Sequence, residues 1–417
     1  MAGYSATTAV LTATAFFFLS FGDAVWAAEL PVVQVQLGVS IAAVGWILFA
    51  ANAGVVVMPL AGHCVDRFGS HRVVVAAGAA TGVLWIVPGL ASSLWSLIAT
   101  MLALGAARSG FLLVAAEALA SQWEHARGRP VMSYFHAIFS VGGVLGALAG
   151  SGFAAAGTAL PWVMTIVGGV QTLTFLALGA ATWHSSRTVS VAGVARDNTG
   201  SPAQPEVCGF AAADLQPEGK LGGRGFRLLY LLGLCATIGE VAVTGWSALY
   251  LRRELHVPAH VAPYGYAVFA LAMAVGRLCG SAFVARFGSV NVLCWSGFLA
   301  ACGLLGTVLL PEPGLAILAF GVAGAGAACV FPLLLSMAAQ LAPARPGRTM
   351  ARMVLCTQIG TLCSPVLISV LVRLTTIQCA LGGPAAAYLV IALGSLLMRR
   401  RSTDSSYATR TRHPSIF

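Results

Sequence analysis

Apolar runs of similar length recur along the chain and are separated by short polar segments. Each run holds about 20 residues, which is the length of an α-helix that crosses the hydrocarbon core of a bilayer. The pattern predicts an all-α integral membrane protein with twelve transmembrane helices. The predicted spans cover residues 8–29, 41–61, 73–91, 95–122, 134–156, 160–182, 227–250, 264–284, 290–310, 314–341, 351–374 and 380–398.

A short repeat groups these spans into two halves. The sequence Arg-Phe-Gly-Ser at 67–70 recurs at 286–289, and the same offset of 219 residues superimposes Gly-Arg at 128–129 on Gly-Arg at 347–348. Such a repeat predicts two pseudo-symmetric six-helix lobes. We expect an N-terminal lobe at 1–183, a cytoplasmic linker at 184–225, a C-terminal lobe at 226–398 and a disordered cytoplasmic tail at 399–417.

Composition indicates that lipid is the solvent of this fold. Hydrophobic residues make up 58% of the 417-residue chain, charged residues make up 9%, and the mean hydropathy is +0.87. A water-soluble fold of this length could not bury so much apolar surface.

The net charge of +10 is a topology signal and not a sign of nucleic-acid binding. Of the 23 Lys and Arg residues, 18 fall on the side of the two termini, two fall inside spans, and three fall on the other side, namely Arg252, Arg253 and Arg373. Because cytoplasmic loops carry an excess of Lys and Arg, we expect both termini in the cytoplasm. Abundant Ala, Gly and Arg beside a single Lys suggest a bacterial source, and hence the cytoplasmic (inner) membrane.

The sequence lacks the motifs that are typical of several other classes of protein. The ten cysteines form no C-x-x-C or Cys/His cluster, so we interpret them as small buried hydrophobes. The only lysine, Lys220, lies in no phosphate-binding loop, and the chain has no H-E-x-x-H sequence and no repeated channel-filter loop. We therefore expect no enzyme activity, no cofactor and no metal site.

The loop after the second predicted span carries Gly62, Asp66, Arg67, Gly69 and Arg72. It resembles the G-x-x-x-D-R-x-G-x-R signature of the major facilitator superfamily, in the loop where that family carries it. We expect Gly62 to let helices approach, Asp66 to cap or pair at a helix end, and Gly69 to make the turn.

A second copy of this motif follows the eighth predicted span. It keeps Gly276, Arg277, Arg286 and Gly288 but has Ala285 in place of the acidic residue. An acid-dependent latch is therefore expected only in the first lobe.

Most of the remaining chain resembles one subgroup of that family, the bacterial transporters related to fucose-type sugar permeases. The resembling stretches are 21–26, 30–31, 37–40, 128–130, 135–137, 139–143, 239–240 and 246–248. The resemblance implies a secondary carrier with two lobes related by an axis along the membrane normal and a site between them near the midplane. It implies no particular substrate, because Leu113 and Glu117 stand where members of the subgroup often carry Asp and Asn.

Ionisable residues inside spans are expected to carry the mechanism, since each costs about 2.5–3.5 kcal/mol at the bilayer centre without a cavity or partner. Asp23 and Glu240 lie 217 residues apart, close to the repeat offset, and are predicted to face a central cavity. Arg108 and Glu117 share the fourth span, but nine residues at about 100° each give a half turn, so we expect them to face different ways.

We hypothesise that Asp23 or Glu240 neutralises Arg108 across this cavity. Protonation of an acid, in the order of preference Asp23, Glu240 and Glu117, would then couple proton movement to alternating access. A fixed ion pair that locks helices together is the alternative interpretation for each of these acids.

Other polar and aromatic residues in the spans are candidates for the substrate cavity, because they need partners or a ligand. They are Trp26, Asn52, His136, Trp246, Gln358 and Tyr388. For His136, a helix-end residue that touches lipid or backbone is favoured over a proton relay. Glycines at 142, 146 and 150 give the fifth span one flat face, which predicts close helix packing, with an exporter signature as the alternative.

Together these features predict a monomeric secondary active transporter that moves a small organic solute across a lipid membrane by alternating access, coupled to protons. A proton-driven efflux pump for a drug or secondary metabolite is one alternative. A transport-inactive membrane receptor or sensor is the other, although the linker and tail are short for an output domain.

Overall fold

The computed structural model describes residues 6–127, 132–186, 223–341 and 346–410, and every regular element within them is a helix. The first half contains α1 (Ala6–Gln36), α2 (Ile41–Asn52), η1 (Ala53–Val57), α3 (Met58–Phe68), α4 (Ser70–Ile86), η2 (Val87–Leu90), α5 (Leu94–Gly105), η3 (Ala106–Leu112), α6 (Leu113–Arg127), α7 (Met132–Ala155) and α8 (Leu160–Ser186). The second half contains α9 (Gly223–Arg253), α10 (Tyr264–Phe287), α11 (Ser289–Leu309), α12 (Pro313–Ala327), α13 (Val330–Leu341), α14 (Pro346–Leu374), α15 (Ile377–Ala380) and α16 (Gly382–Arg410).

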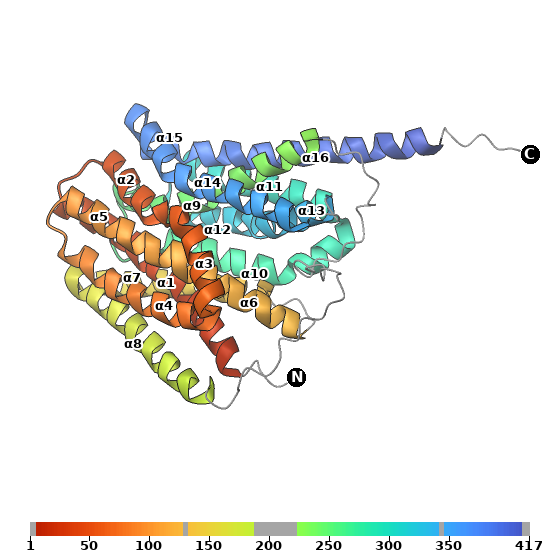
Figure 1. Ribbon diagram of the computed structural model, residues 1–417. Helices are drawn as coiled ribbons and strands as arrows, with labels where there is room; N and C mark the ends of the chain where they lie inside the picture. The colour runs from red at the N-terminus through yellow and green to blue at the C-terminus, as the bar shows by residue number, and fades with distance from the viewer. Residues whose placement is uncertain (1–5, 128–131, 187–222, 342–345, 411–417) are drawn as a thin grey trace, which may run out of the picture.

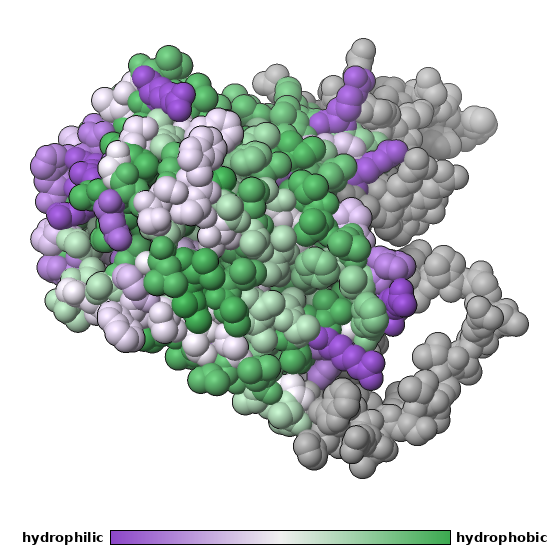
Figure 2. All heavy atoms as spheres, turned by 60° about the vertical axis from the view of Figure 1, so that its left-hand side comes forward, coloured by the Kyte–Doolittle hydropathy of each residue, from purple (hydrophilic) through white to green (hydrophobic). Residues whose placement is uncertain are grey.

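Twelve helical segments of the described residues are long and apolar enough to cross a membrane. This confirms the predicted all-α fold and its number of spans. The surface agrees, because large side chains such as Trp95, Leu173 and Leu309 are more than two-thirds exposed. Figure 2 shows hydrophobic residues over most of the visible face and hydrophilic residues gathered toward its ends, as a lipid-facing surface requires.

The helices form two lobes, α1–α8 and α9–α16, which lie one below the other in Figure 1. Within the first lobe α1 packs along α7 and α4 along α8, while in the second α11 packs against α12 and α16, and α9 against α14. The lobes meet where α7 contacts α10, α2 contacts α14 and α1 contacts α9. Helix α1 begins and α16 ends at the same end of the bundle, which we call the terminal end, and α15 lies at the opposite, far end.

Three spans are interrupted in their middle part. The second consists of α2, the 3₁₀ turn η1 and α3, which has Pro59 in its first turn. The tenth breaks between α12 and α13, just before Pro332, which has no N–H to donate to the carbonyl of Ala328. The fourth contains a π-helical segment, η3, between α5 and α6. These breaks expose backbone groups or shift side chains in the middle of the bundle.

Two helices extend further than the sequence predicted. Helix α1 continues through Pro31 to Gln36, because the apolar side chains around that proline, such as Leu30 and Val33, are buried in the bundle. Packing of this face outweighs the one helical hydrogen bond that proline removes. Helix α16 runs to Arg410, where a disordered tail was expected from Arg399, while residues 411–417 and most of the predicted linker lie outside the described residues.

The glycine face of the fifth span packs closely, as predicted. A Cβ atom on Gly142 would lie 2.3 Å from the carbonyl oxygen of Phe17, and one on Gly146 would lie 2.4 Å from that of Phe21. Only glycine lets α1 and α7 approach to this distance.

Both copies of the loop motif turn the chain at a glycine. Gly69 has φ +85° and Gly288 has φ +79°, a region that residues with a side chain rarely adopt. The guanidinium group of Arg67 lies 5.4 Å from the ring centroid of Phe68, and the next copy repeats this contact between Arg286 and Phe287.

Two expectations for the first motif were wrong in this structure. Apart from the backbone of its own helix, no atom of the described residues lies within 4 Å of the position where Gly62 would carry a Cβ, so this glycine makes no close helix contact among them. Asp66 is exposed in the last turn of α3 and has no hydrogen bond or ion pair among the described residues. Its position near the negative end of a helix dipole gives it no favourable cap. Arg72 is likewise exposed.

Candidate functional site

A cavity of about 370 Å³ lies between the two lobes. Residues of α1, α2, η1, α3, η3, α6 and α7 line it from one lobe, and residues of α9, α10, α13 and α14 line it from the other. The structure brings most of the predicted cavity residues to this wall, namely Asp23, Trp26, Asn52, Arg108, Glu117, His136, Glu240 and Gln358.

Asp23 and Arg108 form an ion pair in this cavity. The Nη1 atom of Arg108 lies 2.5 Å from Oδ2 of Asp23, and its Nη2 donates a hydrogen bond of 3.3 Å to the carbonyl oxygen of Ala51. The Arg108 side chain is 10% exposed and that of Asp23 is 25% exposed, whereas Nε of Arg108 is buried and has no partner among the described residues. The pair is therefore well formed, and its carboxylate remains accessible from the cavity.

A close helix contact places Arg108 at this position. A Cβ atom on Gly54 of η1 would lie 1.8 Å from the carbonyl oxygen of Gly105 at the end of α5, so the two spans touch through their backbones. The guanidinium group of Arg108, one turn further along, can then reach the backbone of Ala51 and the carboxylate of Asp23 together.

Arg108 and Glu117 both line the cavity, contrary to the expectation that they face different ways. The reason is the π-helical segment Ala106–Leu112 between them. A π-helical turn bonds residue i to i+5 and holds one residue more than an α-helical turn. The nine residues from Arg108 to Glu117 therefore rotate around the helix axis by about as much as eight α-helical residues, which places the two side chains roughly 80° apart and not 180°. Glu117 is exposed, and no described residue forms an ion pair with it.

Glu240 pairs with a different arginine from the one we considered. Its Oε1 lies 3.6 Å from Nη2 of Arg277 on α10. Nη1 of Arg277 donates 2.8 Å to Oγ of Ser140 and 3.4 Å to the carbonyl oxygen of His136, both on α7. The sequence grouped Gly276 and Arg277 with the second copy of the loop motif and also placed both inside the predicted span 264–284. They lie in the middle of α10, two turns or more before the loop. Arg277 thus connects the acid of one lobe to a helix of the other.

Three more predicted residues line the cavity with polar atoms. Asn52 Nδ2 donates 2.9 Å to the carbonyl oxygen of Leu48, and Gln358 Nε2 lies 3.4 Å from Sδ of Met58 in the other lobe. Nε1 of Trp26 is buried without a partner among the described residues.

His136 lies against the cavity and not at a lipid-facing helix end. Its ring packs edge-on against Phe16, with a centroid distance of 5.4 Å. Trp246 and Tyr388, in contrast, lie outside the cavity wall and are buried inside the second lobe. The hydroxyl group of Tyr388 lies 3.5 Å from the carbonyl oxygen of Ala236, and its ring fills the space beside Gly239. These two are packing residues.

The sequence missed several cavity residues with hydroxyl groups. Thr237 and Thr244 of α9 and Tyr266 of α10 line the wall, and Oη of Tyr266 lies 3.5 Å from Oγ of Ser20 in the other lobe. Thr237 and Thr244 flank Glu240 at intervals of three and four residues, and this helical spacing is the signal that could have identified them.

At the far end, hydrogen bonds close the space between the lobes. Arg253 of α9 donates to the side-chain oxygen of Gln34 on α1, and Ser369 of α14 donates to the carbonyl oxygen of Ala42 on α2. Oγ of Ser151 donates 2.5 Å to the carbonyl oxygen of His260 in the α9–α10 segment. The central cavity is thus separated from the far end by packed side chains.

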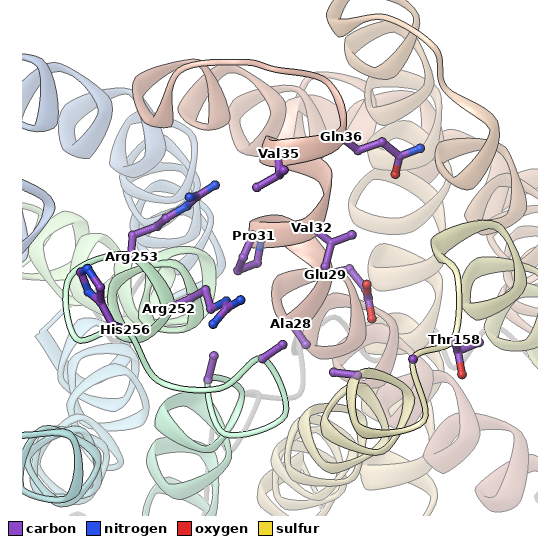
Figure 3. A pocket seen from close by; sticks show the side chains of 14 residues that line it. Ala28, Glu29, Pro31, Val32, Val35, Gln36, Thr158, Arg252, Arg253 and His256 are labelled. Carbon is purple, nitrogen blue, oxygen red and sulfur yellow. The ribbon is translucent and has the colours of Figure 1, made fainter.

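A second cavity of about 660 Å³ lies at the far end, beyond this barrier. Figure 3 shows Glu29 and Gln36 on α1 around it, with Arg252, Arg253 and His256 on the opposing side. Glu29 was not among the ionisable candidates, because the first span was expected to end at this residue.

No group of three or more His, Cys, Asp or Glu side chains in the described part of the chain could hold a metal ion. The polar groups of the central cavity are instead hydroxyls, amides and acid–arginine pairs, which bind organic solutes by hydrogen bonds and charge.

Twelve spans in two lobes with a polar cavity between them define a membrane transporter for small solutes. The sequence model of the Major Facilitator Superfamily matches residues 12–205 and 229–415, and the chain belongs to this family. Proteins of this family and fold are typically not enzymes.

Known relatives agree with this assignment. The chain is 28% identical over 396 residues to an uncharacterized MFS-type transporter of Yersinia pestis, covering 94% of this chain and 96% of that protein. A variant of the nucleoside transporter NupG superimposes with a TM-score of 0.70 at 14% identity, over 94% of this chain and 99% of that one. A bacterial homolog to the human lysosomal transporter Spinster, in an inward-facing and occupied conformation, superimposes with a TM-score of 0.70 at 15% identity, over 96% and 98%. At these identities the two structures share the fold alone.

Proposed function

We propose that this transporter is a proton-coupled carrier of a small polar organic solute, with Asp23 as its principal proton-binding residue. One observation carries the proposal: the carboxylate of Asp23 pairs with Arg108 inside the central cavity and remains partly accessible there. A carboxylate that is both paired and accessible can bind a proton and release the guanidinium group of its arginine.

The exchange would link protons to solute. When Asp23 is protonated it no longer holds the guanidinium group of Arg108, which becomes available to an acceptor on the solute. Nε of Arg108, already without a partner among the described residues, adds a second donor. Loss of the proton restores the ion pair and displaces the solute, so binding of one favours binding of the other.

The second ion pair would link the solute to the lobes. Glu240 holds Arg277 more loosely, at 3.6 Å, while Arg277 also donates to Ser140 across the interface. A solute that contacts Glu240 or Arg277 would change this contact between lobes. Alternating access needs such a difference in interactions between the two states.

The chemistry of the wall favours a neutral or amine-bearing solute with several hydroxyl or amide groups. The wall holds three acids, Asp23, Glu117 and Glu240, against two arginines, so a polyanion would be repelled. A volume of about 370 Å³ also suits a small molecule. The sequence resemblance to fucose-type sugar permeases agrees with a sugar-like or metabolite-like solute.

We further propose that the carrier works as a monomer in a bacterial cytoplasmic membrane, with both termini in the cytoplasm. The distribution of Arg and Lys supports this orientation. Because one chain supplies both walls of the cavity, the site needs no second copy.

The proposal is tested by measuring pH outside lightly buffered sealed vesicles while sugars, amino acids, amines and antibiotics are added in turn. We expect proton movement with at least one class of solute, and its direction relative to the solute decides between uptake and efflux. Asp23→Asn should abolish the proton signal but retain exchange of labelled for unlabelled solute. Glu312→Gln, which also neutralises a carboxylate but at an exposed position away from the cavity, should leave the signal intact. Solute movement without protons would make the protein a uniporter, and no movement with any solute would favour a sensor.

A further inference from the structure

We propose that Glu29 is a second proton-binding carboxyl group of α1, which exchanges protons with the far side of the membrane while Asp23 faces the central cavity. This inference rests on the proposed function for its role in transport. Its structural basis is separate, because it depends on the second cavity and on the isolation of Glu29 within it.

Glu29 is an unusual residue for its environment. It is only 4% exposed, and no described residue forms an ion pair or hydrogen bond with its carboxylate. Its polar end instead faces the second cavity, whose volume of about 660 Å³ admits water. An ionised carboxylate in such a place costs free energy that uptake of a proton would remove.

The positive groups of this cavity are occupied elsewhere or exposed. Arg252 donates 2.8 Å to the carbonyl oxygen of Val257, and Arg253 donates to Gln34. His256 is exposed and its Nδ1 lies 3.1 Å from the carbonyl oxygen of Glu254. These three are the charged or titratable groups that line the cavity opposite Glu29, while the α7–α8 side contributes Ala154, Gly157 and Thr158, which carry no charge.

Helix geometry relates Glu29 to Asp23. The two acids are six residues apart on one continuous helix, which corresponds to a rise of about 9 Å. Asp23 lines the central cavity and Glu29 lines the far cavity, so α1 presents one carboxyl group on each side of the barrier.

Part of the barrier between them is a bulky side chain of α1 itself. Trp26 lies between the two acids in the helix, is buried, and packs against Trp85 with a centroid distance of 6.3 Å. Pro31 deprives the carbonyl oxygen of Ala27 of its usual helical donor, which leaves an acceptor at this level. In this proposal, Trp26 and the side chains packed around it move when the lobes rock and open a path between the two acids.

Chemical labelling from each side of the membrane tests this assignment without any solute. Right-side-out and inverted vesicles are treated with a membrane-impermeant carbodiimide and an amine, and fragment spectra of the N-terminal peptide locate the modified acid. Carbodiimides react with protonated carboxyl groups, so modification of Glu29 should increase with acidity in the vesicles that expose the far end only. Asp23 should react in the other type. Glu254, half-buried in the α9–α10 segment, reports that the reagent reaches the far face.

Modification of Glu254 without Glu29, or of Glu29 from the terminal side, would overturn the inference. The role in transport is tested with Glu29→Gln, which should lose at least tenfold in proton-driven accumulation and keep solute exchange, while Glu29→Asp recovers part of the accumulation. Normal accumulation by Glu29→Gln would also overturn it. If the wild type moves no protons with any solute, the proposed function fails, and the labelling still decides whether Glu29 takes up protons from the far side.

Discussion

The arginine side chains of the central cavity use only part of their capacity to donate hydrogen bonds. Nε of Arg108 and Nε of Arg277 are both buried and have no partner among the described residues. Buried donors without partners cost free energy, about 1–3 kcal/mol each, and are rare in folded proteins. Both arginines line the central cavity, and we expect a bound solute to approach these donors.

The pairing of Asp23 with Arg108 gives a prediction about stability. Removing either charge alone leaves the other in the bundle without its partner, so Asp23→Asn and Arg108→Gln should each lower the stability of the purified protein, by about 1–3 kcal/mol. The double variant Asp23→Asn/Arg108→Gln should regain most of this loss, because no unpaired charge remains. The midpoint of thermal unfolding in detergent measures the stability of the three variants. A double variant that is less stable than either single variant would show that the two side chains act independently.

Sequence patterns identified Asp23, Arg108 and Glu240 as cavity residues, since an ionisable group within an apolar run needs a cavity or partner. They could not give the partner of Glu240, because Arg277 lies 37 positions further along, on another helix, and only the packing of α9 and α10 joins them. Glu29 was missed because the first span was expected to end at this residue. Trp246 and Tyr388 look like cavity residues in sequence, but the direction of a side chain around a helix depends on packing that periodicity alone does not determine.

Helices α2 to α6 show how backbone geometry sets the position of a charge. The contact between Gly54 and Gly105 brings the second and fourth spans together, and the π-helical segment that follows turns Arg108 and Glu117 toward one cavity. Neither feature follows from hydrophobic periodicity, which assumes an unbroken helix of about 3.6 residues per turn. This is why the twelve spans were predictable while the relation of Arg108 to Glu117 was not.

A matched pair of substitutions tests the contact between these spans. Gly54→Ala places a methyl group where the Gly105 carbonyl oxygen lies 1.8 Å away, and should cost about 1–3 kcal/mol as the helices separate. Gly62→Ala lies on the same span with no atom within 4 Å, and should be neutral or stabilising, because alanine favours a helix over glycine by about 1 kcal/mol. The midpoint of thermal unfolding reports both. Equal effects of the two substitutions would mean that the Gly54 contact does not hold the spans together.

The two lobes repeat a common plan but differ where they carry charge. Asp23 and Glu240 occupy corresponding helices, yet Asp23 pairs within its lobe at 2.5 Å, while Glu240 pairs at 3.6 Å with an arginine that also reaches the other lobe. The repeat of Arg-Phe-Gly-Ser predicted the symmetry of the layout. The asymmetry of the charges depends on single positions, such as Ala285 opposite Asp66.

Distances between the lobes test the central claim, which is that they rock about the cavity between them. Spin labels are attached to Leu90 and Leu309 at the far end, and in a second variant to Phe68 and Phe287 at the terminal end, after the ten native cysteines are replaced. All four positions are exposed, and each pair is related by the repeat offset of 219 residues.

Electron–electron double resonance then measures the distance between the two labels of each variant, first in alkaline buffer and then in acidic buffer that contains a transported solute. We predict that the far-end distance lengthens as the terminal-end distance shortens, and that Asp23→Asn makes both distances independent of pH. Distances that stay fixed at both ends under all conditions would contradict alternating access and would leave the protein a sensor on a transporter fold.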